Sequence, residues 1–163
     1  MSRYRPPQPK SSPYITRQGF EALKEESDAL WQRRKEVTAA LSAAAAEGDR
    51  SENAEYIYRK KELAGLDRRI RYLQKRLPDL TVVDRKAEGD AIFFGATVLL
   101  ESDDRQRTVT IVGADEIDPA RQFISIDSPL ARALLKKTVD DEVTIEVEGE
   151  SITYYVLSVQ YVE

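Results

Sequence analysis

The feature that most constrains this chain is a pair of hydrophobic ladders arranged symmetrically about residue 50. Each ladder advances in alternating steps of three and four residues, the spacing that places side chains along one seam of an α-helix. Position 44 corresponds to 56, 37 to 63, 30 to 70 and 23 to 77, so a chain that folds back at residue 50 brings the two seams face to face. The backward ladder is Ala44, Leu41, Val37, Arg34, Leu30, Ser27, Leu23 and Phe20, and the forward ladder is Tyr56, Arg59, Leu63, Leu66, Ile70, Leu73, Leu77 and Leu80.

This symmetry predicts an antiparallel helical hairpin with its tip at residues 48–53. The first helix is expected to run from Thr16 to about Glu47, because Gly48 is a suitable residue to end it. The second helix is expected to begin within residues 49–53 and to end before Pro78, since a proline disfavours the helical conformation in the residue that precedes it. Small side chains at residues 42–46 make the tip of the hairpin slender.

After a linker at residues 81–90 the hydrophobic period changes from that of a helix to that of strands. A short helix is expected from Pro129 to about Lys137, with Ser128 as its N-cap. The predicted fold class is α+β: an antiparallel coiled-coil hairpin, then a compact domain with a mostly antiparallel sheet and one short helix. The domains are a proline-rich disordered leader at 1–13, the hairpin at 14–84 and the sheet domain at 85–163. Strands are predicted at residues 92–101, 107–112, 123–126, 142–147 and 151–161.

The composition excludes several kinds of site. The chain contains no cysteine and no histidine, which excludes a disulfide framework and a thiolate zinc site and removes the commonest general base. No segment approaches the roughly 20 apolar residues of a membrane span, and the start of the chain has no secretory signal. We therefore expect a cytoplasmic protein with no membrane contact, in which carboxylates carry any acid–base or metal chemistry.

Positive charge is concentrated on the second predicted helix. The chain has a net charge of −4, yet residues 59–76 alone carry +6. A solvated helix face normally mixes both signs, so this bias favours a surface that binds a polyanion, although an ordinary solvated face stays open as an alternative. The candidate residues are Lys60, Lys61, Arg68, Arg71 and Lys75.

Two carboxylates, Asp49 and Glu52, lie three residues apart at the predicted tip. Both are within reach of one Mg²⁺, but this ion prefers six oxygen ligands, so the pair cannot hold it tightly alone. The tip would instead complete a metal site supplied by another molecule and help to orient a water on the metal. The same Asp-x-x-Glu spacing is also that of a helix capping box, and the spacing does not decide between the two roles.

The tip sequence Gly-Asp-Arg-Ser-Glu-Asn-Ala-Glu-Tyr at residues 48–56 resembles the coiled-coil tip of the bacterial Gre transcript cleavage factors. Three further stretches, at residues 93–96, 111–117 and 124–137, look like the GreB branch of that family. Together these motifs, in the order of the family, are far more specific than the tip alone. The resemblance covers about Tyr14 to Val162 and leaves out the proline-rich leader.

The resemblance implies a monomeric transcription elongation factor that binds at the rim of the secondary channel of RNA polymerase. The sheet domain, FKBP-like in the family, would dock through Asp127, Ser128 and Pro129 while the coiled coil enters the channel. The carboxylates of Asp49 and Glu52 would share a Mg²⁺ with the polymerase and activate the water that cleaves backtracked RNA at its 3′ end. The protein would be an accessory factor that holds no metal stably by itself, with the basic face of the second helix on the extruded RNA.

Two other functions stay open. A Gre-like regulator would insert the same hairpin and inhibit the polymerase without promoting cleavage, and the intact pair of Asp49 and Glu52 speaks against it. A non-catalytic helical-hairpin interaction module would need neither the one-sided basic face nor the acidic tip.

Overall fold

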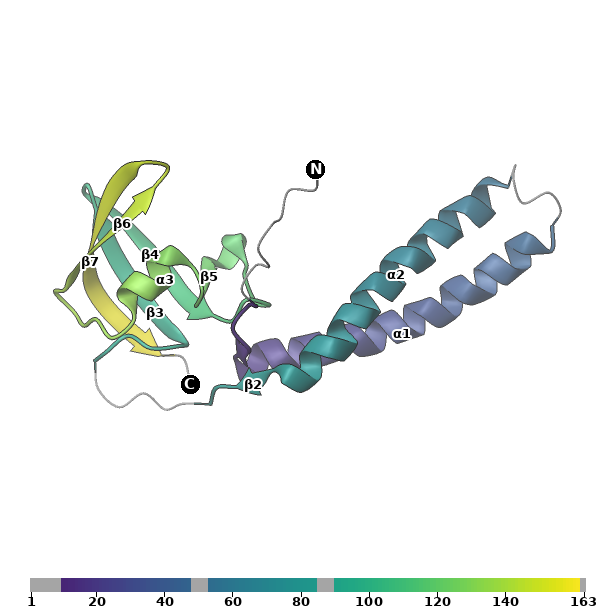
Figure 1. Ribbon diagram of the computed structural model, residues 1–163, viewed down its shortest axis with the longest axis horizontal. Coiled ribbons are helices and arrows are strands. Elements are labelled where there is room, and N and C mark those ends of the chain that lie inside the picture. Colours follow the sequence, from purple (N-terminus) through teal and green to yellow (C-terminus); the bar gives the residue numbers. More distant parts are fainter. Residues whose placement is uncertain (1–9, 48–52, 85–89, 162–163) are drawn as a thin grey trace, which may run out of the picture. The chain divides into compact units, whose positions relative to one another are not determined.

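The computed structural model describes residues 10–47, 53–84 and 90–161, and the chain divides into two compact units. The hairpin unit spans Gln18–Leu80, and the sheet unit combines Met1–Arg17 with Thr81–Glu163. Figure 1 shows the elements in chain order, which are β1 (Tyr14–Ile15), α1 (Arg17–Ala45), α2 (Ala54–Asp79), β2 (Thr81–Val82), β3 (Ala96–Ser102), β4 (Arg105–Val112), a 3₁₀ helix η1 (Pro119–Arg121), β5 (Phe123–Ser125), α3 (Pro129–Leu134), β6 (Glu142–Val147) and β7 (Glu150–Tyr161).

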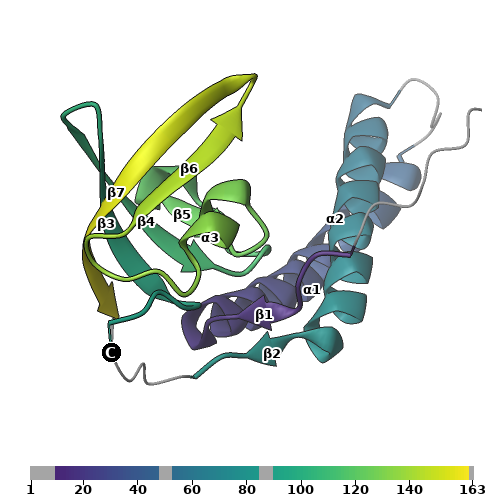
Figure 2. The same cartoon turned by 60° about the vertical axis from the view of Figure 1, so that its left-hand side comes forward.

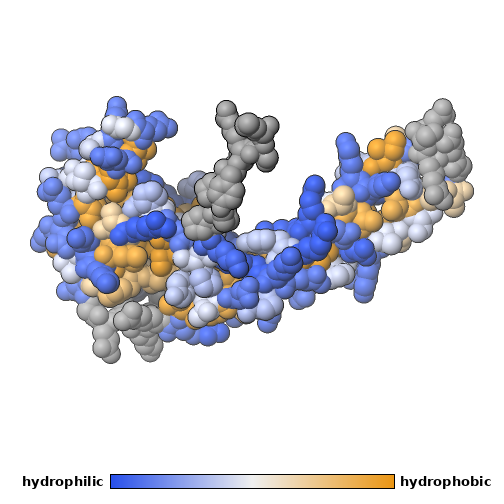
Figure 3. Space-filling view, viewed as in Figure 1, coloured by the Kyte–Doolittle hydropathy of each residue, from blue (hydrophilic) through white to orange (hydrophobic). Residues whose placement is uncertain are grey.

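The hairpin unit consists of α1 and α2, which run antiparallel as predicted (Figure 1). All residues of the two predicted ladders are buried or half-buried, which confirms the seam. On the face of the hairpin visible in Figure 3, hydrophilic residues cover most of the surface and hydrophobic residues form smaller patches. This is expected when only one stripe of each helix is apolar. Within the described residues, neither helix is long and apolar enough to cross a membrane. The fully or nearly fully buried seam residues are Leu23, Val37, Ala44, Ile70 and Leu73.

Polar contacts between the helices agree with the predicted register. The Nε atom of Arg34 lies 2.7 Å from Oδ1 of Asp67, one residue away from the predicted pairing of positions 34 and 66. Two nitrogens of Arg69 donate to the two carboxylate oxygens of Glu26, at 2.6 and 2.8 Å. Glu26 lies five residues from position 31, the predicted partner of 69, so the two contacts together centre the fold-back between residues 47 and 51, a range that includes the predicted centre.

The end of α2 differs from the prediction. The helix continues to Asp79 and includes Pro78, so the predicted end ahead of this proline is wrong. A proline removes one N–H donor, and in the last turn that loss is confined to one hydrogen bond. The backbone N–H of Leu80 still donates to the carbonyl oxygen of Leu77 at 3.3 Å and closes the turn.

The sheet unit contains a five-stranded sheet in the order β5-β4-β3-β7-β6. Neighbouring strands are antiparallel except β4 and β5, which are parallel because the segment containing η1 carries the chain back before β5 begins. The expected antiparallel sheet is therefore mixed at one edge. Figure 2 shows the sheet curled, with α3 against one of its sides. The core between them contains Val98, Leu100, Ile111, Leu134 and Val156, all fully buried.

Two predicted boundaries shift because the chain turns. Strand β3 begins at Ala96 instead of residue 92, since Gly95 adopts a φ of 87° in the preceding turn, a conformation that suits glycine. Helix α3 ends at Leu134 instead of about Lys137, because the N–H of Lys136 donates to the carbonyl of Ile92 at 2.7 Å.

The sequence gives no periodic signal for the short parallel pair of β1 and β2, in which Tyr14 faces Thr81 and Ile15 faces Val82. Ile15 is fully buried. The backbone packs so closely beside β1 that a Cβ atom on Gly113 would lie 2.0 Å from the carbonyl oxygen of Tyr14. The sequence assigns residues 14–17 and 81–84 to the hairpin, but in the structure they belong to the sheet unit. Arg17 belongs to that unit although it is the first residue of α1.

The segment before α1 is also held by side chains of the sheet unit. The carboxylate of Glu116 accepts hydrogen bonds from the N–H and the hydroxyl of Thr16 and from the N–H of Gly113, the two N–H bonds measuring 3.1 and 2.8 Å. The carboxylate of Asp127 accepts bonds from the N–H of Ser12, at 2.9 Å, and from its hydroxyl. Residues 10–13, assigned to a disordered leader, thus include defined contacts, whereas residues 1–9 lie outside the described residues.

The register predicts the outcome of a crosslinking experiment. Because the chain has no cysteine, cysteines introduced at 30 and 70 would be its only thiols. We expect this pair to crosslink readily, since the positions face each other across the seam. Cysteines at 30 and 63 should not crosslink, because seven residues displace the second thiol by roughly 10 Å along the helix. The mobility of the oxidised chain on a non-reducing gel measures the crosslink. The register would be contradicted if the pair 30 and 63 crosslinked efficiently and the pair 30 and 70 did not.

Candidate functional site

The predicted metal ligands Asp49 and Glu52 lie outside the described residues. The structure describes the two helix ends that lead to them, Ala45 at the end of α1 and Ala54 at the start of α2. Within the described part of the chain, no group of three or more acidic residues could hold a metal ion.

Asn53 joins the two helix ends beside the tip. Its Oδ1 atom accepts a hydrogen bond from the N–H of Tyr56 at 3.2 Å, which makes Asn53 the N-cap of α2. Its Nδ2 atom donates to the carbonyl oxygen of Ala44 at 2.9 Å. The N-cap therefore lies four residues after Asp49, and a capping box led by Asp49 does not start this helix. Sequence reasoning missed this residue, although asparagine is among the most favoured N-cap residues.

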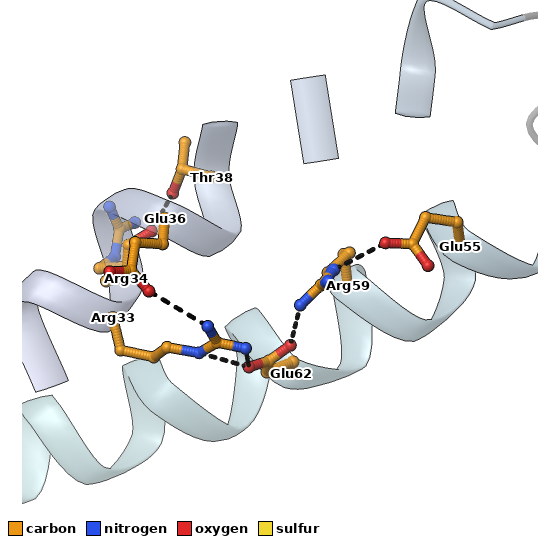
Figure 4. Close-up of polar contacts among 7 residues, drawn as sticks. All are labelled: Arg33, Arg34, Glu36, Thr38, Glu55, Arg59 and Glu62. Carbon is orange, nitrogen blue, oxygen red and sulfur yellow. Dashed lines mark hydrogen bonds and ion pairs between the residues drawn. The ribbon is translucent and has the colours of Figure 1, made fainter. Parts of the chain in front are cut away.

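A chain of ion pairs connects the flanks of α1 and α2 (Figure 4). Arg59 donates to Glu55 at 2.9 Å and to Glu62 at 3.0 Å. The other oxygen of Glu62 accepts two bonds from Arg33, at 2.9 and 2.6 Å, and Arg33 also pairs with Glu36 at 3.1 Å. Five charged side chains on two helices thus form one continuous network.

Apart from Arg76, the cations of α2 separate into two groups according to their partners. Arg59 and Arg69 are neutralised by carboxylates of the hairpin. The five predicted RNA-binding residues are all exposed. Among the residues that the structure describes, none of the five has an ion pair, and Arg71 has only a long bond of 3.4 Å from its Nε to the carbonyl oxygen of Asp67. These five residues are Lys60, Lys61, Arg68, Arg71 and Lys75.

The ion pairs shift the titration of the groups that form them. Hydrogen bonds, first from Arg33 and then from Arg59, lower the pKa of Glu62 below its ordinary value of 4.5. The hydrogen bond from Arg69 likewise lowers the pKa of Glu26, against a smaller opposing effect of burial. The pKa values of Arg33 and Arg59 are raised, chiefly by hydrogen bonds to Glu62 and Glu55 respectively. These contacts therefore favour the charged forms of Glu62, Glu26, Arg33 and Arg59.

Of the predicted docking residues, Asp127 and Ser128 lie between β5 and α3, and Pro129 is the first residue of α3. Ser128 is the N-cap of α3, and its Oγ atom accepts a bond from the N–H of Ala131 at 3.2 Å. Pro129 is exposed at the first position of this helix. Ser128 also borders a hollow of about 530 Å³ on the sheet unit. The other residues that line the hollow are Arg107, Ile117, Pro119, Gln122, Phe123, Ile124 and Ser125.

Comparison with known proteins decides the family. The profile of the transcription elongation factor N-terminal domain matches residues 13–82, and that of the GreA/GreB C-terminal domain matches residues 86–161. The chain belongs to the GreA/GreB family of transcription elongation factors. Its matched segments include the whole hairpin and the whole five-stranded sheet.

Curated members of the family resemble the chain over nearly its full length. It is 56% identical to transcription elongation factor GreB of Xanthomonas axonopodis pv. citri, covering 99% of this chain and 98% of the relative. It is 53% identical to GreB of Yersinia pestis, covering 92% and 90% of the two chains. Among solved structures, this chain is similar to the GreA factor homolog 1 (Gfh1) protein of Thermus thermophilus, with 23% identity and a TM-score of 0.43. The alignment covers 90% of this chain and 97% of the Gfh1 chain.

The lowered pKa of Glu62 predicts a pH-dependent stability of the hairpin. Glu62 becomes protonated at a lower pH in the folded chain than in the unfolded chain. Its ion pairs therefore stabilise the folded hairpin fully above the unfolded-state pKa of about 4.5, and this stabilisation is lost as the pH falls through the lower pKa of the folded state. We expect Glu62→Gln to lower the melting temperature at neutral pH and low salt. The helical circular dichroism signal measures this melting.

Glu25→Gln is the matched control, because Glu25 is exposed on α1 and has no ion pair within the described residues. It should leave the melting temperature nearly unchanged at every pH. The difference in melting temperature between the two variants should disappear at acidic pH, because Glu62 is then protonated and as uncharged as the glutamine that replaces it. A difference that persists at acidic pH would show that Glu62 acts through packing and not through its charge.

Proposed function

We propose that this chain inserts its hairpin into the secondary channel of RNA polymerase and stimulates the polymerase's own cleavage of backtracked RNA. The curated relatives that cover nearly its whole length are named transcription elongation factor GreB. One observation carries the cleavage role: Asn53 fulfils the N-cap function of α2, so the capping explanation for Asp49 and Glu52 loses its support. Two carboxylates at the tip of a hairpin are then best explained by chemistry outside this chain.

In this proposal Asp49 and Glu52 supply two oxygen ligands to a Mg²⁺ that the polymerase holds with its own residues. The two carboxylates would hold the ion in place, and when bound it would supply Lewis-acid activation of water and charge stabilisation at the phosphate. Asn53 ties the start of α2 to the end of α1, and thus limits how far the two ends of the tip segment can separate. The chain is an accessory factor, and the polymerase remains the enzyme.

The basic face of α2 provides the contact with RNA. Its five exposed cations have no carboxylate partner among the described residues, so their charge is available to phosphates. The acidic side chains of the hairpin are used instead at the flanks, where Glu62 and Glu26 neutralise arginines. RNA extruded from a backtracked polymerase would follow the unpaired cations along the helix.

The sheet unit provides the docking surface, with Asp127, Ser128 and Pro129 at its edge. The hollow next to Ser128 supports this role because it includes Ile117, whose residue surface is 56% exposed. An exposed apolar side chain beside a hollow is typical of an anchor position in a protein interface. The factor would bind as a monomer, in the cytoplasm where bacterial polymerase works.

Replacement of Asp49 tests the metal role. Asp49→Asn removes the charge and leaves the N-cap at Asn53 intact, so the fold should be unaffected. We expect cleavage of RNA in a stalled, backtracked complex to fall roughly 100-fold or more, because metal-assisted water activation contributes several kcal/mol to the transition state. Extra Mg²⁺ should partly restore the rate, and affinity for the polymerase should persist. Glu52→Gln should behave in the same way.

Asn53→Ala is the control for a purely structural effect at the tip. It removes the N-cap and should destabilise the start of α2 by about 1 kcal/mol, without a response to added Mg²⁺. Near-normal cleavage by Asp49→Asn at low Mg²⁺ would remove the metal role. Inhibition of the polymerase by the wild-type chain without any cleavage would favour the inhibitory regulator instead.

The basic face is tested by a combined replacement of Lys61, Arg68, Arg71 and Lys75 with glutamine. Because each phosphate contact adds about 0.7 to the salt slope for single-stranded nucleic acid, we expect the slope to fall by up to about 3. Cleavage in deeply backtracked complexes should weaken, and cleavage in complexes backtracked by one step should change little. Replacing Lys24 and Lys35 of α1 with glutamine is the control; because it removes half as many charges, an effect about half as large there would show that only total charge matters.

A further inference from the structure

A second hollow lies on the hairpin, lined by an aromatic and a basic residue of α1 and by polar and apolar residues of α2. It has a volume of about 480 Å³ and lies entirely within the hairpin unit. This volume is within the roughly 300–1,000 Å³ of small-molecule sites. Its lining residues are Trp31, Arg34, Asp67, Ile70, Arg71 and Gln74.

Trp31 is the unusual member of this set. It is 41% exposed and is the only tryptophan in the chain. Among the described residues it has no ring, cation or hydrogen-bond partner, in contrast to Tyr72, over whose ring the Arg69 guanidinium lies at 5.2 Å. A large aromatic ring that borders a hollow without an intramolecular partner provides a free surface for stacking.

The polar residues of the hollow complement a nucleotide. Gln74 offers both a donor and an acceptor, the pair of groups that recognises the edge of a base. Arg71 is exposed and has no carboxylate partner within the described residues, so its guanidinium can contact a phosphate. Arg34 and Asp67 hold each other at 2.7 Å, which fixes one wall of the hollow.

We propose that this hollow is a subsite for one base of single-stranded RNA, which stacks on Trp31 while Arg71 contacts an adjacent phosphate. The inference rests on the proposed function, since the basic face of α2 is what brings RNA to the hairpin. Charge complementarity favours RNA over a protein segment, because exposed Arg68 and Lys75 extend the positive surface on either side of Arg71. Stacking on an aromatic ring needs no particular base, as suits a factor that meets arbitrary transcripts.

The fluorescence of Trp31 tests this directly in the free full-length chain. Oligoadenylate should quench the emission, because a base stacks on the indole. Inorganic polyphosphate should compete for the basic face but should not quench, since it has charge and no bases. Equal quenching by both polyanions, or no quenching by bound oligoadenylate, would overturn the subsite.

Variants separate stacking from charge and from folding. Trp31→Ala should weaken the binding of labelled oligoadenylate, measured by anisotropy, on the order of 5- to 100-fold, and Trp31→Phe should restore most of the affinity. Neither variant should change the binding of polyphosphate or the melting temperature appreciably. Tyr155→Ala, at an exposed aromatic residue of the sheet unit, is the matched control and should have no effect.

The outcomes of this experiment are distinct from those of the cleavage assay. If oligoadenylate binds through charge but Trp31→Ala does not weaken it, the subsite is wrong and the proposed function stands. If Trp31→Ala lowers affinity for the polymerase and not for RNA, the hollow faces protein, and the subsite is again wrong. Quenching together with normal cleavage by Asp49→Asn would support the subsite and remove the metal role of the tip.

Discussion

The hairpin depends on an apolar seam that is narrow along its whole length. Val37, Ile70 and Leu73 are buried in it, while the residues directly before and after each of them in the sequence are polar, charged or tyrosine. A seam this narrow removes little apolar surface from water, and so leaves the relative sliding of the helices weakly opposed. The ion pairs between Arg33 and Glu62 and between Glu26 and Arg69 lie at its edges, where a shift in register would separate every pair at once.

The same requirement sorts the charges of α2 by function. Acidic residues at the flanks of the seam form ion pairs with arginines, so their negative charge is cancelled within the hairpin. The lysines and arginines of the basic face are exposed and have no ion pair among the described residues, so no acidic side chain there cancels their charge. The net charge of +6 over residues 59–76 is therefore concentrated on the outer face of the helix.

Sequence periodicity was sufficient for the hairpin and for most strands, because both signals are local. Buried Leu73 and Val98 lie at the positions that the helical and strand periods predict. The pair of β1 and β2 could not be predicted in this way, since two-residue strands have no period and their pairing joins residues 67 apart. The candidate sites differ in the same way. The exposure of Lys61 could be predicted from helix geometry, whereas the hollow at Trp31 could not, because it is formed by side chains of both helices.

The pairing of β1 with the sheet unit determines the order in which the chain can fold during synthesis. The contacts of the hairpin lie within residues 18–80, so the ribosome releases everything it needs early. Tyr14 and Thr16 precede the hairpin, yet Gly113 and Glu116, which they contact, are translated about a hundred residues later. The first strand of the protein to be made is therefore among the last to be buried, and a nascent chain that stalls before Gly113 exposes an apolar segment that chaperones or proteases can recognise.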